Sequence, residues 1–315
     1  MGFGDEIMAT AYAKAVVKKY PEAKAIFGDP KNHLDAGTNT LKVSFSEVFL
    51  NNPHILQEGE AIKDFVCIPD YPGCRMYVDY EKSQTEGNKI MAFSWNPEFR
   101  AARGQLFFTD QEKSVAAAIV ARLPFPFYAI EPNVAGKDWI NKKAWAWDRW
   151  QAVVDQTVAH SVGGDEAFPW VQLSGPHLAG VVGLENLPFR VACAVLSCAN
   201  GLLTTDGALH HAAAALGVPA VVLWGHYSSP TTFGYEDQVN LRESDRMSLG
   251  CGTTYGECPE CPKSMAAITV PQVLKALVAI TNPDSPKAYK FQEDPGGPPP
   301  IFKPVSGYGK EKPYV

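Results

Sequence analysis

The sequence predicts an α/β protein built on a parallel β-sheet with helices on both faces. Apolar runs of four or five residues recur from residue 125 onward, and stretches with helical spacing of apolar residues separate them. Strands of a parallel sheet are buried on both faces, so continuous apolar runs are their expected pattern. With 315 residues, the chain is long enough for two domains of moderate size.

The second half of the chain alternates regularly between the two kinds of element. The expected strands are 127–130, 170–173, 202–205 and 220–224, and the expected helices are 147–160, 189–199 and 208–216. This alternation is typical of a doubly covered parallel sheet, and we assign residues 125–281 to one domain.

The first 124 residues are assigned to a shorter N-terminal domain with fewer signals. Helices are expected at 6–20 and 111–122 and short strands at 25–27 and 65–69, whereas most of 30–110 has no clear pattern. Residues 282–315 are rich in proline and glycine and predict a tail, either disordered or packed back on the N-terminal domain.

Charge and apolar runs limit the classes of function. The net charge of -6 argues against non-specific nucleic-acid binding, which uses a basic surface. No apolar run approaches the roughly 18 residues of a membrane helix, and the first residues lack the basic and apolar regions of a secretory signal. We therefore expect a cytoplasmic protein without stable membrane insertion.

A glycine loop, Gly2-Phe3-Gly4-Asp5, precedes the first expected helix. Gly-x-Gly allows a ligand close to the backbone, and helix N-terminal amides favour anions. The dinucleotide fingerprint needs a third glycine where this chain has Ile7, which disfavours a nucleotide-dependent oxidoreductase or epimerase. Asp5 has two interpretations, an N-cap of the helix or a carboxylate base facing a cleft.

Two further segments place polar groups at helix starts. Lys143 precedes the expected helix 147–160, where it either meets a phosphate or is a solvated surface lysine. Asp206, Gly207 and Ala208 lie where a parallel strand ends and a helix begins, the usual ligand site of open α/β sheets. The alternative is that Asp206 only caps this helix and that the histidines at 210 and 211 are buried packing partners.

Three of the seven cysteines cluster near the end of the second domain. Cys258 and Cys261 have the spacing of zinc ligands, and Cys251 precedes them, but a second Cys-x-x-Cys or His pair is missing. We expect free thiols or a loop staple here, and no metal site.

Taken together, these segments resemble glycosyltransferase family 9, the ADP-heptose transferases. Residues 2–10 are similar to the family's first glycine loop, and residues 143–150 to its lysine and tryptophan-bearing helix entry. Residues 206–217 match the register of the family's signature, in which an aspartate is followed by a histidine, three alanines and a glycine. The strand ending at 223–225 and the segment 258–268 are also similar.

The resemblance implies the GT-B arrangement, in which two Rossmann-like domains face a cleft. It implies an inverting, metal-independent transferase without a cofactor that moves a sugar from a nucleotide-sugar donor to an acceptor hydroxyl, with Asp5 as the base. The implied donor-binding residues are Gly4, Lys143, Asp206, Gly207, Ala208, His210 and His211.

The chain departs from the family's pattern at several positions. Ala208 replaces the glycine of the signature, and Ala146 replaces a usual proline. No first strand precedes Gly2, so we expect a reduced or rebuilt N-terminal domain, or a native start upstream of Met1.

Other functions stay open at this point. One is a non-catalytic nucleotide-sugar-binding module. Another is a viral glycosyltransferase that acts on modified DNA bases, since the acidic balance disfavours a nucleic-acid acceptor without excluding it. The acceptor is otherwise a saccharide or another hydroxyl compound.

Overall fold

The computed structural model describes residues 2–28, 45–60, 64–69, 73, 75–134, 140–159, 169–243 and 248–281. The tail predicted for 282–315 lies outside these residues, and its packing on the N-terminal domain stays a prediction.

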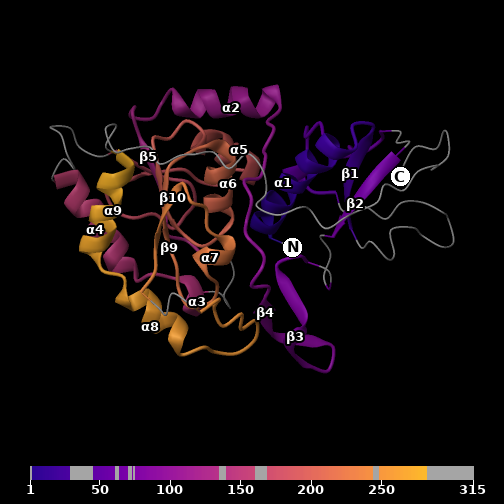
Figure 1. Ribbon diagram of the computed structural model, residues 1–315. Coiled ribbons are helices and arrows are strands. Elements are labelled where there is room, and N and C mark those ends of the chain that lie inside the picture. The colour runs from indigo at the N-terminus through magenta and orange to yellow at the C-terminus, as the bar shows by residue number, and fades with distance from the viewer. Residues whose placement is uncertain are drawn as a thin grey trace.

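A six-stranded parallel sheet forms the centre of the second half (Figure 1). Its strands are β5 (Tyr128–Glu131), β6 (Trp170–Gln172), β7 (Val182–Gly183), β8 (Leu202–Thr205), β9 (Ala220–Leu223) and β10 (Gln238–Leu241). The order across the sheet is β10-β9-β8-β5-β6-β7. From β5, the chain adds β6 and β7 on one side. It then crosses back, so that β8, β9 and β10 are added on the other side of β5. The alternation predicted for this region is confirmed.

Helices cover both faces of this sheet. On one face lie α5 (Phe189–Leu196) and α6 (Ala208–Leu216), and on the other α4 (Trp147–Ala159) and α9 (Val270–Thr281). Successive strand residues point to opposite faces, so Leu202 packs in the core cluster of α5 and α6, whereas Leu203 packs with α4 and α9. The short helices α3 (Ile140–Lys143), α7 (Pro230–Phe233) and α8 (Glu260–Ala267) complete this part.

The N-terminal part has a much smaller sheet among its described residues. β1 (Ala23–Gly28) and β2 (Asp64–Pro69) pair in parallel, and Ile55 adds an isolated bridge to Ala25. Helix α1 (Phe3–Lys19) packs on β1, and a short 3₁₀ helix, η1 (Glu47–Phe49), lies beside it. This agrees with the expected reduction of the N-terminal domain.

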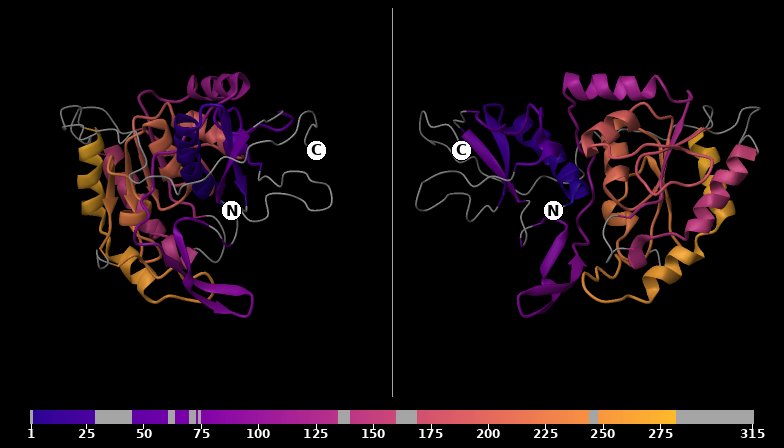
Figure 2. Two further views of the ribbon diagram at one scale, coloured as in Figure 1. Left: turned by 45° about the vertical axis from the view of Figure 1, so that its right-hand side comes forward. Right: turned by 180° about the vertical axis from the view of Figure 1, so that it is seen from behind.

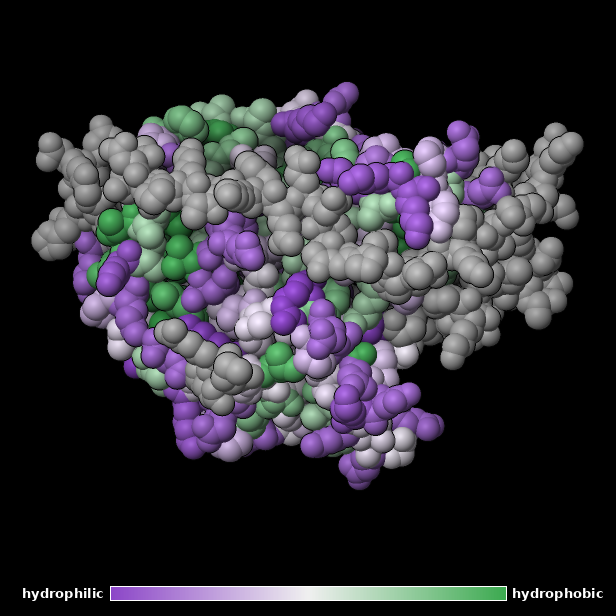
Figure 3. All heavy atoms as spheres, in the orientation of Figure 1, coloured by the Kyte–Doolittle hydropathy of each residue, from purple (hydrophilic) through white to green (hydrophobic). Residues whose placement is uncertain are grey.

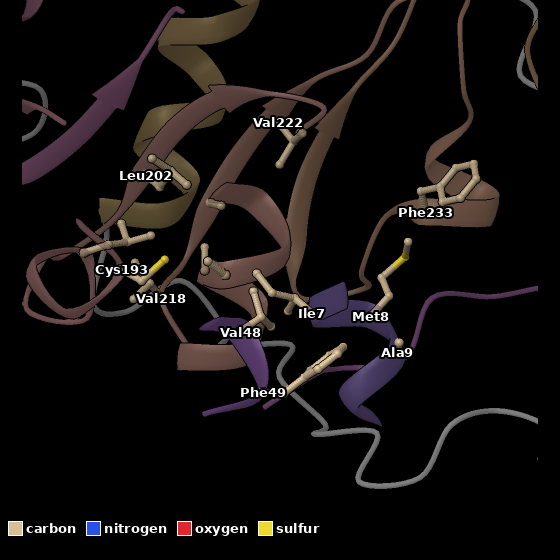
Figure 4. Packing of buried hydrophobic residues seen from close by; sticks show 14 of the residues in the cluster. Ile7, Met8, Ala9, Val48, Phe49, Cys193, Leu202, Val218, Val222 and Phe233 are labelled. Carbon is tan, nitrogen blue, oxygen red and sulfur yellow. The ribbon is translucent and has the colours of Figure 1, made fainter. Parts of the chain in front are cut away.

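Helix α1 lies between the two sheets and packs directly against α6, as Figures 1 and 2 show. Its Ile7 and Met8 belong to the same buried cluster as Val48, Phe49 and the sheet residue Val222 (Figure 4). One hydrophobic core therefore runs from the small sheet through α1 and α6 to the large sheet.

Two segments of the first 124 residues pack on the large sheet's side of the molecule. The antiparallel hairpin of β3 (Val78–Glu86) and β4 (Lys89–Trp95) joins it through a hydrogen bond from the Phe93 amide to the Gly252 carbonyl at 2.8 Å. Its far end is exposed and hydrophilic (Figure 3). Helix α2 (Asp110–Val120) packs on α5, with Arg190 Nε 2.6 Å from Glu112 Oε1. The division at residue 124 stays a prediction.

Among the described residues, no single helix is long and apolar enough to cross a membrane, and only α8 and α9, bent by 64°, meet that test as a pair.

Candidate functional site

A cavity of about 550 Å³ lies where the large sheet reverses its strand order. The cavity is lined by residues that follow three neighbouring strands. They are Val134 after β5, Asp206 to Ala208 after β8, and Tyr227 and Ser228 after β9. The first turn of α1, from Gly2 to Asp5, also lines the cavity. Ligands of open α/β sheets bind at this switch point, and the volume falls in the range of small-molecule sites.

Lys143 and Asp206 form an ion pair in the wall of the cavity. Lys143 Nζ lies 2.8 Å from Asp206 Oδ2 and 4.9 Å from the centre of the Tyr227 ring, and Ser228 Oγ donates a hydrogen bond to the same carboxylate oxygen. Burial favours a higher pKa for Asp206, but Lys143 and these hydrogen bonds outweigh it and hold the pKa below its ordinary value. Asp206 therefore partly neutralises Lys143, the predicted phosphate-binding residue. Asp206 does not cap α6, because Gly207 is the N-cap and the Asp206 carboxylate is bound to Lys143 and Ser228.

His210 is fully buried and supports the start of α6 from inside. Its Nδ1 accepts a hydrogen bond from the Gly207 amide at 3.0 Å, so Nε2 carries the proton and donates to the Phe233 carbonyl at 3.3 Å. Burial lowers the pKa of His210 to about 4, which keeps it neutral near pH 7. His210 does not line the cavity, and the Gly207 N–H already has a partner.

The start of α6 offers further backbone amides beside the cavity. Ala208 and Leu209 begin α6, and the first amides of a helix have no partner within it. Ala208 lines the cavity together with Gly207. This end of α6 can therefore bind an anion, as predicted for the segment.

His211 and Gly4 join the two parts of the molecule. His211 Nδ1 lies 2.8 Å from the Tyr235 hydroxyl, and burial lowers the pKa of His211 well below its ordinary value. A β-carbon added to Gly4 would lie 2.8 Å from His211 Cδ2 and 3.3 Å from the Ala208 Cα. Gly4 thus lets α1 approach α6 closely, in addition to lining the cavity.

Asp5 lies in the first turn of α1 and lines the cavity, but it is not the N-cap. The helix begins at Phe3, three residues earlier than expected, and Gly2 is the N-cap. Asp5 Oδ2 accepts the Gly2 amide N–H at 3.2 Å. The capping interpretation of Asp5 is therefore corrected to an acceptor at the third helical position, a geometry that leaves the side chain in the cavity wall.

An aromatic wall that the sequence did not predict closes the cavity beside the hairpin. Tyr77, Phe93 and Trp95 come from the N-terminal part and meet Tyr227 and Phe233 of the C-terminal part. Trp95 Nε1 donates to the Tyr227 carbonyl at 3.0 Å, which fixes one side of the wall to the other. These rings pack edge to face and offer a ligand a large apolar surface.

Two further charged residues lie in or near the site. Arg75 lines the cavity and adds a second cation to it. Lys142 is buried and donates to the Thr254 carbonyl at 3.0 Å, so it supports a loop rather than facing solvent.

The geometry defines an α/β protein with a cavity of small-molecule size that a glycine loop and the N-terminus of a helix line at the switch point. Two solved structures of similar fold are a family 9 glycosyltransferase and a heptosyltransferase. One is the family 9 glycosyl transferase from Veillonella parvula, at 13% identity and a TM-score of 0.54, covering 89% of this chain and 94% of that one. Another is E. coli ADP-heptose lps heptosyltransferase II, at 14% identity and a TM-score of 0.52, covering 89% and 96%.

These two matches show the fold over most of the chain. The six-stranded parallel sheet is that of the GT-B heptosyltransferase structures, as the resemblance implied. A protein-family scan and a search of curated proteins by sequence give no match.

Proposed function

We propose that this protein is an inverting, heptosyltransferase-like glycosyltransferase that uses a nucleotide-sugar donor. One observation carries the proposal: the carboxylate of Asp5 on α1 lines the same cavity as Lys143 and the start of α6. A base and an anion site in one cavity are what transfer from a diphosphate leaving group needs.

The proposed step is a single displacement at the anomeric carbon. Asp5 takes the proton of the acceptor hydroxyl while its oxygen forms the new glycosidic bond. The bond to the diphosphate breaks, and the diphosphate leaves with the electron pair. One displacement inverts the configuration of that carbon.

Lys143 and the amides at the start of α6 would stabilise the charge on the leaving diphosphate. An ammonium group has three N–H donors, so Lys143 can serve Asp206 and a phosphate oxygen together. Arg75 lines the same cavity and adds a positive charge to it. The E. coli heptosyltransferase is named for ADP-heptose, so ADP-sugars are the first donors to test.

We also propose that the leaving group is held without a divalent metal. Ligand atoms of Asp206, His210 and His211 lie within 4.8 Å of one another, a grouping that could suit a cation. However, Asp206 Oδ2 is paired with Lys143, His210 Nδ1 accepts the Gly207 amide, and His211 Nδ1 meets Tyr235. A metal at this place would have to displace these partners.

The test is thermal stabilisation by ADP, UDP and GDP in a chelating buffer, followed by a donor-hydrolysis screen with nucleotide sugars. We expect at least one diphosphate to raise the melting temperature without added metal. Stabilisation that appears only with magnesium or manganese would contradict the metal-free part. No stabilisation by any diphosphate or sugar nucleotide would contradict the donor site itself.

A cytoplasmic location is proposed on separate grounds. Cys67, Cys193, Cys198, Cys251, Cys258 and Cys261 are not in disulfides. Unbridged thiols in this number are typical of a reducing compartment. Quantifying free thiols in protein taken directly from the producing cells would test it, and disulfide-linked cysteines would count against it.

A further inference from the structure

Three cysteines outside the cavity point their sulfur atoms at one place. Cys251 lies in the loop before α8, Cys258 precedes that helix, and Cys261 lies in its first turn. Their Sγ atoms lie within 4.8 Å of one another, and those of Cys251 and Cys261 are 3.5 Å apart. Cys261 is buried and the other two are half-buried. None of the three lines the cavity.

The spacing of these thiols fits a shared metal ion better than a disulfide. Zinc–sulfur bonds of about 2.3 Å in a tetrahedral site place ligand sulfurs roughly 3.8 Å apart. A disulfide needs about 2.05 Å and joins only two sulfurs. The Sγ atoms of Cys251 and Cys261 are 3.5 Å apart, which is close to the separation of two zinc ligands. A metal ion can also bind the third thiol, Cys258, which a disulfide would leave out.

We propose that Cys251, Cys258 and Cys261 bind one thiophilic divalent ion of the zinc type. Soft thiolate ligands select such ions over magnesium or calcium. The ion would be structural, because its ligands do not face the cavity that holds Asp5 and Lys143.

The loop that carries Cys251 is hydrogen-bonded to residues that line the cavity. The Gly252 carbonyl accepts the Phe93 amide at 2.8 Å, and the Gly252 amide donates to the Tyr227 carbonyl at 3.0 Å. Two residues on, the Thr254 carbonyl accepts Lys142 Nζ at 3.0 Å. Phe93 and Tyr227 both line the cavity.

A bound ion would therefore tie α8 to the loop that positions one wall of the site. Gly252 itself has a positive φ of 59°, and a β-carbon there would lie 2.0 Å from the Phe93 carbonyl oxygen, so this contact is tight. Removing the ion should loosen the wall without removing any residue from the cavity. The metal site does not depend on the proposed transferase activity.

The experiment measures metal binding by the full chain purified under reducing conditions. We expect about one zinc ion per chain by elemental mass spectrometry, and thiolate-to-cobalt absorption bands after exchange with Co²⁺. Zinc should also protect three thiols from alkylation. Cys258→Ser, at a half-buried position, is expected to weaken Co²⁺ binding at least about tenfold.

Matched variants separate a site from a general effect on folding. Cys198→Ser, at an exposed cysteine near the end of α5, should bind the metal as the original chain does. Cys251→Ser and Cys261→Ser should lose binding, with the fold checked by circular dichroism. The proposal is overturned if the reduced chain binds neither zinc nor Co²⁺, if Cys258→Ser binds as well as Cys198→Ser, or if Cys251 and Cys261 are found in a disulfide in reduced preparations.

Discussion

Lys143 Nζ lies 2.8 Å from Asp206 Oδ2, which joins the two residues that the sequence assigned separately to the donor site. Asp206 is buried, and Lys143 is mostly shielded from water, with 18% of its side chain exposed. Removing the ammonium would therefore leave an uncompensated carboxylate in the wall, and its effects on stability and on binding have to be separated.

Lys143→Met removes the charge and keeps an unbranched side chain. If the ammonium also meets the diphosphate, the Kd for a nucleoside diphosphate should rise about 10- to 150-fold, which corresponds to about 1.5–3 kcal/mol. Titration calorimetry on the folded variant measures it. The double variant Lys143→Met/Asp206→Asn should regain stability but not affinity.

Lys113→Met is the matched control, because Lys113 pairs with Asp110 on the exposed surface of α2. It should leave both Kd and melting temperature unchanged. Equal diphosphate affinity in the Lys143 and Lys113 variants would show that Lys143 is only a partner of Asp206.

The two buried histidines predict a loss of stability in mild acid. The pKa of His210 falls to about 4 through burial, against an ordinary 6.5, even though Asp206 Oδ1 lies 3.9 Å from its ring. Between these values the unfolded chain binds more protons, so stability rises with pH by up to about 1.4 kcal/mol per unit for each such histidine. The contribution is complete above pH 6.5 and is lost as the pH falls toward 4.

Urea midpoints measured from pH 7.5 to 4.5 test this expectation. The original chain should lose stability steeply below pH 6.5, and His210→Gln should have a shallower slope whatever its absolute stability. His177→Gln, at a histidine outside the cluster, should keep the steep slope. A flat profile for the original chain would contradict the burial of neutral histidines at 210 and 211.

Gly4→Ala tests the close approach of α1 and α6. Its new β-carbon would lie 2.8 Å from His211 Cδ2 and 3.3 Å from the Ala208 backbone, so the helices must move apart. Overpacking lowers the free energy of unfolding by about 1–3 kcal/mol, and the higher helix propensity of alanine offsets about 1 kcal/mol of this loss. We expect a lower melting temperature. Gly2→Ala, whose nearest atom would be Asp5 Oδ2 at 3.9 Å, should have little effect, and equal stability of the two variants would rule out the tight contact.

Gly207→Ala, unlike Gly4→Ala, introduces a β-carbon without a steric clash. Gly207 is extended, with φ of -179°, and the nearest atom to an added β-carbon is 3.9 Å away. Stability should stay the same. If the diphosphate packs against this backbone, its affinity should fall about tenfold, the effect of about 1.4 kcal/mol. Unchanged affinity would place the diphosphate elsewhere in the cavity.

The large sheet could be predicted from the sequence because each of its strands has a recognisable local pattern. Runs such as Ala220 to Leu223 are buried on both faces and consist only of apolar residues. The segment at Asp206 was predicted because it follows such a strand, and the glycine loop because it precedes a helix. Tyr227 and Ser228 follow β9 at the same edge, so the rule that indicated Asp206 would have found them too.

The hairpin and its aromatic wall had no comparable local signal. β3 has mostly half-buried or exposed residues, and its pairing with β4 is irregular between Asp79 and Thr85. Trp95 is fixed by Tyr227 and Phe233, more than 130 residues further along the chain. Such contacts are set by the folded arrangement rather than by periodicity, which is why residues 30–110 could not be interpreted.

Asp5→Asn separates a transferase from a protein that only binds nucleotide sugars. Asparagine keeps the size of the side chain and an oxygen that can accept the Gly2 amide, but it cannot take a proton. Fold and donor affinity should survive, while sugar transfer should fall about 10²- to 10⁴-fold. The measurements are melting temperature, diphosphate affinity and transfer rate on the same preparation.

Two controls make the Asp5 result specific. Asp110→Asn removes a carboxylate from the first turn of α2, where the side chain is exposed, and should change none of the three measurements. Asp5→Ala also removes the acceptor of the Gly2 amide, so it should lower stability by about 1 kcal/mol as well as abolishing transfer. If Asp5→Asn transfers sugar at the original rate, Asp5 is not the base. Asp79 on β3 does not replace it, because its carboxylate is paired with Lys82 at 2.7 Å and does not line the cavity.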